Sequence, residues 1–348
     1  MLAGVGHDER HLCFSRMRDP PVPSDLAADF LARCGRLCND QAADLEILMD
    51  TVLAALAPRN SPADLDHRTL LASPRTADRQ RLWSQIGLAQ MHLAVHTIDH
   101  VRTLATTLAD PQTRVPVYAH AGLARAAVES AALLLHLLAA GDVFEMRLAR
   151  GVALLVVDAG AAAKAAVLVP GNAYMPSPGP AVSADRDRLL DLVDRALITR
   201  VPNRRGAGTK GIQVSGQPEV PVAVKASDLA AAHVADQPAL DGLLSGVVHG
   251  LPWGLADSAS LRGREMLWEP GPMDIAGSVL AAVAAASKVG AGFAAYRGFA
   301  GDPLVGRLDG RVTLVDQVMR EFGRRWGVLA GRTPTIARFL AGDTPPRR

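Results

Sequence analysis

The fold is decided by residues 118–168, which read YAHAGLARAAVESAALLLHLLAAGDVFEMRLARGVALLVVDAGAAAKAAVL. Apolar residues recur at helical spacing through residues 118–138 and again through residues 142–168. Gly141 ends the first pattern, and the acidic Asp142-x-x-Glu145 motif starts the second, as expected at helix boundaries. The stretch therefore predicts two consecutive helices at the centre of an all-α protein.

Charged side chains interrupt the apolar faces of both predicted helices. At about 100° per residue, Arg125, Glu129 and His136 share one narrow stripe on the first helix. The second helix carries four more ionic residues: Arg147, Arg150, Asp158 and Lys164. Because an unpaired buried charge is strongly destabilising, we expect these groups to pair within the helix, as Arg125 with Glu129, or across to Asp158.

Two interpretations of this polar seam stay open. In the first, the charges form a buried salt-bridge network that fixes how the helices pack. In the second, Arg125, Arg147 and Arg150 receive an anion, while Glu129 and a histidine transfer protons.

The rest of the chain predicts a multi-helix bundle with a small β-hairpin insertion around residues 211–224. Residues 200–211 are basic and glycine-rich and are expected to form a loop. The expected divisions are an N-terminal arm (1–23), an N-terminal helical bundle (24–170), a Pro/Gly loop (171–182) and a C-terminal helical part that carries the hairpin (183–348) and packs on the first as one compact unit.

Composition limits the classes of partner. The 348 residues carry a net charge of +2 and contain only 4% aromatic residues, so neither a global attraction to nucleic acid or anionic membranes nor a base-stacking surface is indicated. Cys13, Cys34 and Cys38 are expected to be free thiols, and residues 1–19 lack the apolar run of a signal peptide. We therefore expect a cytoplasmic protein without membrane contact.

A histidine-rich segment offers an alternative metal site. His92 and His96 are one helical turn apart, and Asp99 follows on the same face, with His100 displaced toward its flank. The segment lacks the glutamate of a zinc-protease motif, and the chain lacks the paired E-x-x-H motifs of di-iron bundles. The histidines are therefore expected to be structural, with a metal site at His92, His96 and Asp99 as the alternative, and no cofactor is expected.

His249 is the strongest single catalytic candidate. It follows Ser245 by one turn, and Pro252 is expected to end its helix, where the helix dipole raises the proton affinity of a histidine. A histidine that bonds the last carbonyls of that helix for structural reasons is the other interpretation. The expected ligand contacts are Ser245, His136, His100 and Trp253.

The combination of Asp99-His100, Arg125-x-x-x-Glu129, Arg147-x-x-Arg150 and Ser245-x-x-x-His249-Gly250 resembles a group of actinobacterial helical proteins that are distantly similar to HEPN-type domains. HEPN ribonucleases carry R-x-x-x-x-H, in which Arg and His act on the 2′-hydroxyl and phosphate of RNA. In this chain Leu244 takes the place of that Arg, so an arginine from elsewhere would have to substitute. The resemblance implies a homodimer with the site near its axis.

Three functions follow from these patterns. The first is a HEPN-like protein that acts on or binds RNA or a phosphorylated ligand through His249, Arg125, Glu129, Arg147 and Arg150. The second is a small-molecule helical-bundle enzyme, either without a metal or assisted by one at His92, His96 and Asp99. The third is a non-catalytic scaffold or sensor whose buried charges pair with one another.

Overall fold

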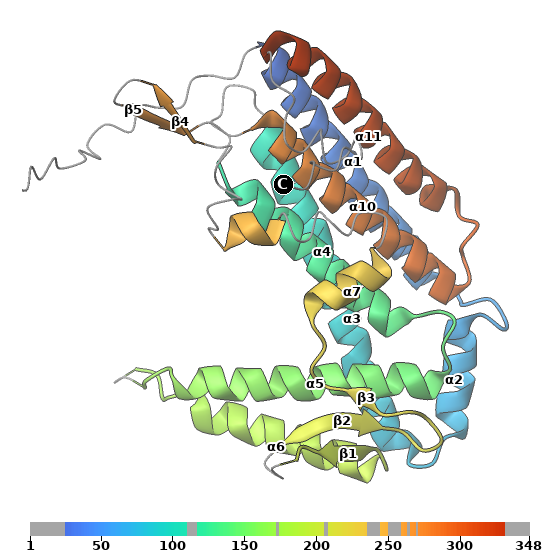
Figure 1. Ribbon diagram of the computed structural model, residues 1–348. Helices are drawn as coiled ribbons and strands as arrows, with labels where there is room; N and C mark the ends of the chain where they lie inside the picture. Colours follow the sequence, from blue (N-terminus) through green and yellow to red (C-terminus); the bar gives the residue numbers. More distant parts are fainter. Residues whose placement is uncertain are drawn as a thin grey trace, which may run out of the picture.

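The computed structural model describes residues 25–109, 117–171, 174–204, 208–234, 244–249, 259–262, 265–268 and 271–330. The fold is all-α, as predicted from the sequence (Figure 1). The helices are α1 (Asp25–Ala54), α2 (Pro62–Ala72), α3 (Thr76–Ala109), α4 (Ala119–Leu138), α5 (Phe144–Val167), α6 (Gly179–Arg195), α7 (Ala226–His233), α10 (Pro272–Arg297) and α11 (Pro303–Ala330).

A small antiparallel sheet is inserted after α6. Its strands are β1 (Thr199–Pro202), β2 (Thr209–Gln213) and β3 (Val220–Pro221), in that order across the sheet. The predicted hairpin is confirmed as β2 and β3, in which Ile212 lies opposite Val220. The prediction that residues 200–211 form a loop is wrong at both ends of this range, where residues 200–202 belong to β1 and residues 209–211 to β2. Proline is tolerated at the end of an edge strand such as β1, and the strand is too short for its alternation to stand out.

A second antiparallel pair was not predicted from the sequence. Strands β4 (Ala259–Arg262) and β5 (Glu265–Trp268) pair with each other, with Ala259 opposite Trp268. Each strand has only four residues, which is too few for periodicity to distinguish a strand from a loop.

The larger of two hydrophobic cores, here called the bundle core, lies among α1, α3, α4, α10 and α11. Helix α10 is buried on nearly all sides because its alanines, glycines and valines allow neighbouring helices to approach closely. A side chain at Gly35 would lie 3.1 Å from the Ala105 carbonyl oxygen of α3, so only glycine permits that contact without a shift. The rings of Phe30 and Phe322 stack 3.9 Å apart and join α1 to α11.

Two helices in the described part of the chain, α4 and α10, are long and apolar enough to cross a membrane by length and composition alone. This is weak evidence, because core helices of soluble proteins share these properties. In the most apolar windows of α4 and α10, 56% and 78% of the residues are buried inside the protein, as expected for helices of the bundle core.

The smaller core, here called the arm core, lies under the three-stranded sheet. Its largest fully buried side chains are Leu82, Ile86, Leu148 and Ile212. Helices α5 and α6 contribute to it and then continue as an arm that projects away from the bundle (Figure 1). Helix α3 belongs to both cores, because its first half carries Leu82 and Ile86 while its second half enters the bundle core.

A buried ion pair lies where the two cores meet. The Arg147 guanidinium of α5 donates to Asp66 Oδ1 at 2.5 Å and to Asp66 Oδ2 at 2.8 Å, and both side chains are at most 2% exposed. Arg147 Nη1 also donates to the carbonyls of Ala139 and Asp142 in the turn between α4 and α5. The Tyr296 hydroxyl of α10 donates to Asp66 Oδ2 at 3.0 Å, so one network joins α2, α5, α10 and that turn.

This network corrects the pairing expected from the sequence. The predicted pair of Arg125 with Glu129 is confirmed, at 2.7 Å. Asp158, however, lies on an exposed face of α5, and the buried partner of Arg147 is Asp66. Periodicity along α5 carries no information about an acidic residue on α2, which explains the error.

The two cysteines in the described part of the chain are free and buried in the bundle core, as expected. Burial raises the pKa of the Cys34 thiol to about 12, so this thiol is protonated and unreactive at neutral pH. Cys13 lies outside the described residues.

We expect Asp66→Ala to lower the free energy of unfolding by about 3–5 kcal/mol, because it leaves the Arg147 guanidinium buried without its partner. The double variant Asp66→Ala/Arg147→Met should recover part of that loss. Urea unfolding followed by circular dichroism measures both changes. Arg68→Ala is the control, since Arg68 is about half exposed, pairs with Asp64 and should cost under about 1 kcal/mol. An equally small loss for Asp66→Ala would contradict the assignment.

His120 makes the fold sensitive to acid. Its Nε2 donates to the Val117 carbonyl at 3.0 Å, which leaves Nδ1 to accept the Ser278 hydroxyl at 2.8 Å. Burial lowers the pKa of His120 to about 4, against about 6.5 in an unfolded chain. Since the unfolded chain then binds the proton more readily, this stabilisation is complete above about pH 6.5 and is lost as the pH falls toward 4.

We therefore expect His120→Gln to reduce the loss of unfolding free energy between pH 7 and pH 4 by up to about 3 kcal/mol. Chemical denaturation at a series of pH values measures this. His67→Gln, a substitution of an exposed histidine on α2, should leave the pH dependence unchanged. The same pH dependence in wild type and His120→Gln would show that His120 is not the acid-sensitive group.

Candidate functional site

The polar stripe predicted on α4 faces the junction between the bundle and the arm. Arg125, Glu129 and His136 are partly exposed along this face. Ala132, which helical spacing places between Glu129 and His136 on the same stripe, is instead fully buried in the bundle core, and Leu133 lies beside the polar residues. The stripe is therefore slightly rotated from the one expected.

Three of the predicted catalytic residues meet at one end of this face. Arg125 Nε donates to Glu129 Oε1 at 2.7 Å, and Arg125 Nη1 lies 3.1 Å from His249 Nε2. His249 is exposed and follows a short helical segment, residues 244–248, in which its backbone N–H bonds the Ser245 carbonyl. Because the Arg125 N–H is a donor, His249 Nε2 is its acceptor in this contact.

The residue five positions before His249 faces the bundle core. Leu244 is 4% exposed and packs in the bundle core, so no group from that position can reach a ligand beside His249. Arg125 supplies a guanidinium to His249 from a different helix. Ser245 is half-buried one turn before His249.

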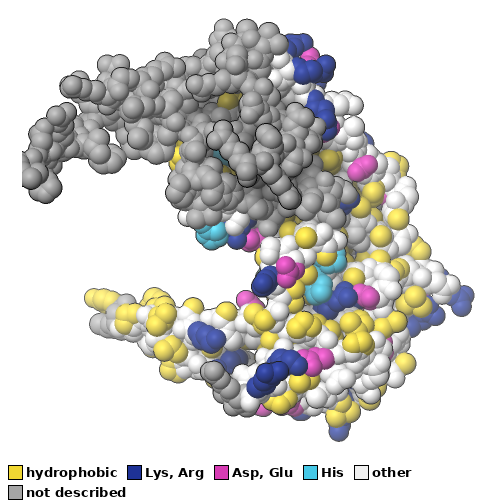
Figure 2. Space-filling view, viewed as in Figure 1, with side chains coloured by type: hydrophobic (Ala, Val, Ile, Leu, Met, Phe, Trp, Pro, Cys, Tyr) yellow, Lys and Arg dark blue, Asp and Glu magenta, His cyan; other side chains and the backbone are white. Residues whose placement is uncertain are grey.

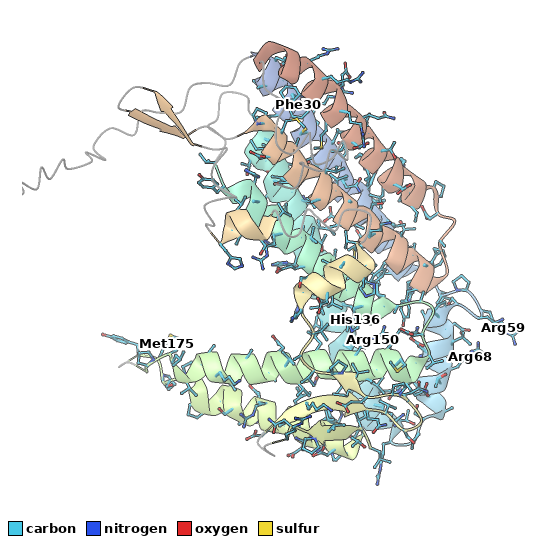
Figure 3. All side chains as sticks on the ribbon, in the orientation of Figure 1. Phe30, Arg59, Arg68, His136, Arg150 and Met175 are labelled. Carbon is cyan, nitrogen blue, oxygen red and sulfur yellow. The ribbon has the colours of Figure 1, made fainter. Side chains whose placement is uncertain are left out.

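A second polar cluster lies at the other end of the same face of α4 (Figure 3). Arg150 of α5 forms an ion pair with Asp142 at 2.5 Å and donates to the His136 carbonyl at 3.0 Å. The rings of His136 and His233 meet edge to face, with centroids 5.8 Å apart. Burial, the Arg150 charge and His233 lower the pKa of His136 to about 4, against the opposing effect of Asp142. Burial and the Arg150 charge also lower the pKa of His233, against the opposing effect of Asp142.

A cavity of about 380 Å³ connects the two clusters and is here called the junction pocket. Glu129 of the first cluster and His136 and Arg150 of the second all line it. The two α4 residues are seven positions apart, or roughly 10 Å along the helix. Most of the remaining wall is apolar and comes from α4, α5, the β3 segment and α7: Leu133, Leu137, Ala153, Leu154, Val157, Val220, Pro221, Val222, Val224, Ala226 and Leu229.

A third polar contact borders the pocket through Ser130. The Ser130 hydroxyl lines the pocket and lies 2.6 Å from His96 Nδ1. The rings of His96 and His100 are 4.1 Å apart, and His100 Nδ1 donates to the His96 carbonyl. Burial and the neighbouring His100 lower the pKa of His96, although Asp99 opposes the shift. His96 therefore supports the pocket wall from behind.

The alternative metal site gains no support from the described residues. His92 and Asp99 are exposed on α3, and His96 turns toward Ser130. Within the described part of the chain, no group of three or more histidine, cysteine, aspartate or glutamate side chains is arranged to hold a metal ion.

The other predicted residues lie apart from the pocket or beyond the described chain. Arg147 is 2% exposed, and its guanidinium is committed to Asp66 and to two backbone carbonyls, so it serves the fold. Trp253 lies outside the described residues. His233 was missed by the sequence analysis, although it occupies the last turn of α7, the kind of position that singled out His249.

Of the expected ligand contacts, Ser245 lies beside the first cluster and His136 belongs to the second. His100 bonds His96, which in turn contacts Ser130 in the pocket wall.

Comparisons of this chain with protein-family models, with curated proteins and with solved structures find no match.

We expect Arg150→Gln to raise the pKa of His136 and of His233, because it removes a positive charge while glutamine can still donate to the His136 carbonyl. The pKa of His136 should stay below 6.5, since burial is the larger cause of its shift. Titration of the imidazole protons by NMR measures both values. Arg102→Gln, on the exposed arginine paired with Glu46, is the matched control and should change neither. An unchanged pKa for His136 in Arg150→Gln would contradict the proximity of the two groups.

Proposed function

We propose that the junction pocket binds a small organic molecule that carries a phosphate group, and that the Arg125, Glu129 and His249 cluster binds that phosphate and transfers protons. The proposal rests on one observation: Glu129 lines the pocket and also holds Arg125, whose guanidinium contacts His249. An apolar chamber and a polar cluster thus share a residue.

The size and lining of the pocket support a small ligand. Ligand pockets are commonly about 300–1,000 Å³, mainly apolar, with a few polar groups that fix orientation. At about 380 Å³ the junction pocket is near the lower limit and suits a compact apolar group.

The cluster suits a phosphate and a proton transfer. A guanidinium offers several donors in a plane and binds phosphate oxygens well. Glu129 accepts a hydrogen bond from Arg125 Nε and so fixes the orientation of the guanidinium. The terminal nitrogens of Arg125 are thereby left on the side of His249. When a phosphate takes over the Arg125 guanidinium, His249 Nε2 is released from the Arg125 N–H and is placed to accept a proton from a hydroxyl that attacks the phosphate, or to return one to a leaving group.

The phosphorylated small molecule is favoured over RNA. A narrow apolar pocket does not follow a nucleic acid backbone, and a net charge of +2 with 4% aromatic residues provides little for backbone attraction or base stacking. The resemblance to HEPN-type domains agrees with the use of Arg and His on a phosphate. The homodimer that this resemblance implies stays a prediction. The proposed function does not depend on it, because residues of a single chain form the two clusters and the pocket.

Phenyl phosphate and phenol form a matched pair of probes. We expect phenyl phosphate to bind and to raise the melting temperature, while phenol binds at least about tenfold more weakly, because it lacks the charge-assisted contacts. Arg125→Ala should weaken phenyl phosphate binding by about 10–100-fold. Arg102→Ala, which removes an exposed arginine on α3, should have no effect.

His249→Gln separates binding from chemistry. It should retain most of the affinity, while any hydrolysis or transfer of the phosphate falls by about 100-fold or more, since the proton acceptor is lost. Isothermal titration calorimetry and a phosphate-release assay measure the two effects. Equal binding of phenol and phenyl phosphate, or phosphate binding that persists in Arg125→Ala, would contradict the proposed function.

A further inference from the structure

The free end of the arm exposes a cluster of large apolar side chains, here called the arm tip. It consists of Val167, Leu168, Val169, Tyr174 and Met175, which are between 50% and 95% exposed. Figure 3 places Met175 at the end of the arm, and Figure 2 shows hydrophobic side chains gathered there. Exposed apolar patches of this kind mark surfaces that contact another molecule or a membrane.

The arm tip lies within an uncharged stretch of sequence. Between Lys164 and Asp185, all 20 residues are uncharged, in a chain in which 21% of residues are charged. The stretch covers the end of α5, the connection and the start of α6. The end of the arm can therefore leave water without burying an ionised side chain, which would be strongly unfavourable.

The backbone of the arm tip is also suited to a low-polarity environment. The N–H groups of Leu168 and Val169 bond the carbonyls of Ala165 and Ala166, and the Ser177 hydroxyl donates to the Val169 carbonyl. Four residues of the stretch are prolines and carry no N–H donor: Pro170, Pro176, Pro178 and Pro180. These four positions thus add no backbone donor that would have to be desolvated when the tip is buried.

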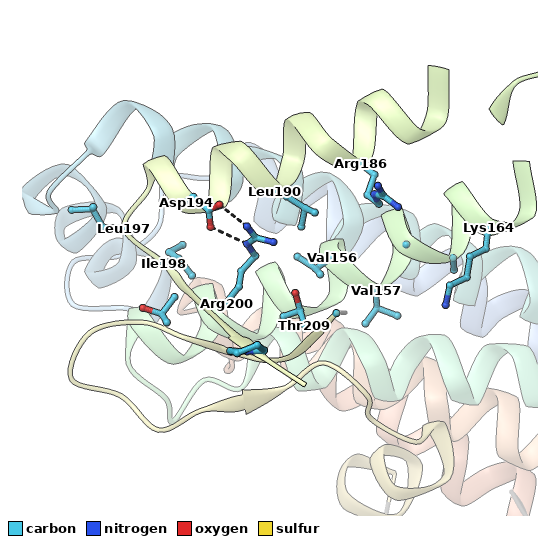
Figure 4. A pocket seen from close by; sticks show the side chains of 15 residues that line it. Val156, Val157, Lys164, Arg186, Leu190, Asp194, Leu197, Ile198, Arg200 and Thr209 are labelled. Carbon is cyan, nitrogen blue, oxygen red and sulfur yellow. Dashed lines mark hydrogen bonds and ion pairs between the residues drawn. The ribbon is translucent and has the colours of Figure 1, made fainter. Parts of the chain in front are cut away.

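Charged residues resume directly behind the arm tip. Lys164 is three positions before Val167, or roughly 4.5 Å along α5. Figure 4 shows Lys164 and Arg186 on the facing helices of a groove along the arm, whose middle is lined by Val156, Val157 and Leu190. Arg186 is paired with Asp187, so the net charge at this level is small. An amphipathic aromatic such as Tyr174 is typical of the boundary between lipid and water.

We propose that the arm tip inserts into the interfacial region of a lipid bilayer, with Lys164 and Arg186 at the level of the headgroups. A depth of one or two helical turns matches the roughly 5–10 Å to which interfacial helices penetrate. A bilayer is favoured over a second copy of the chain because the uncharged tip carries Tyr174 and is flanked by Lys164 and Arg186, an order typical of the boundary between lipid and water. The near-neutral chain gives no long-range attraction, so the contact is local and depends on apolar insertion.

Vesicle sedimentation tests this proposal with the full chain. Wild type should sediment with phosphatidylcholine vesicles, and added anionic lipid or high salt should change the bound fraction little. The double variant Leu168→Asp/Met175→Asp should bind at least about tenfold more weakly, because it places two charges in the inserted region. Leu56→Asp is the matched control, since Leu56 is as exposed as Leu168 but lies off the arm, and it should bind as wild type does.

Circular dichroism and analytical ultracentrifugation of the same proteins complete the test. The double variant should keep the wild-type helical signal and sedimentation coefficient, because the substituted side chains are exposed. Wild type that stays in the supernatant, or a double variant that binds vesicles as well as wild type, would overturn the proposal. A wild-type dimer that the double variant converts to monomer would overturn it in favour of a second copy.

Discussion

The structure depends on one ion pair, between Arg147 and Asp66, at the meeting point of two hydrophobic cores. A charge pair removed from water is stable only when its remaining hydrogen-bonding groups are also satisfied. Here Asp66 receives the Tyr296 hydroxyl, and Arg147 also donates to the turn between α4 and α5. The pair thereby sets the angle at which α5 leaves the bundle, and the shared helix α3 continues from one core into the other.

That angle determines the candidate site. Helix α4 packs its alanines and leucines into the bundle core and turns Glu129 and His136 toward the junction. Helix α5 contributes Arg150, and the β3 segment with α7 covers the opening between them. The junction pocket is thus a consequence of two cores that meet at an angle, with the polar residues of α4 left between them.

The sequence predicted the parts of this arrangement that are local. The two central helices, the Arg125 and Glu129 pair and the helical segment that ends near His249 all depend on residues within one or two turns of each other. Their spacing is enough to identify them. Arg125 and His249 are 124 positions apart, and no pattern in the sequence indicates that they meet. The HEPN-like hypothesis only required that some arginine reach His249, and the fold shows that Arg125 does.

The rest could not be predicted, because it depends on contacts between distant segments. Asp66 is 81 positions from Arg147, and nothing in the pattern of α2 distinguishes the buried Asp66 from the more exposed Asp64. Strands β1, β4 and β5 are too short to show alternation. The exposure of the arm tip follows from the direction in which α5 and α6 leave the arm core, whereas the same apolar residues in sequence suggest an ordinary core helix.

Differential scanning calorimetry of the wild-type protein tests most directly whether the buried pair and the shared helix unite the two cores. The account predicts one cooperative transition, with a calorimetric enthalpy equal to the van't Hoff enthalpy. Two separate transitions, one for the arm and one for the bundle, would show that the cores unfold independently and that their junction does not hold a fixed pocket.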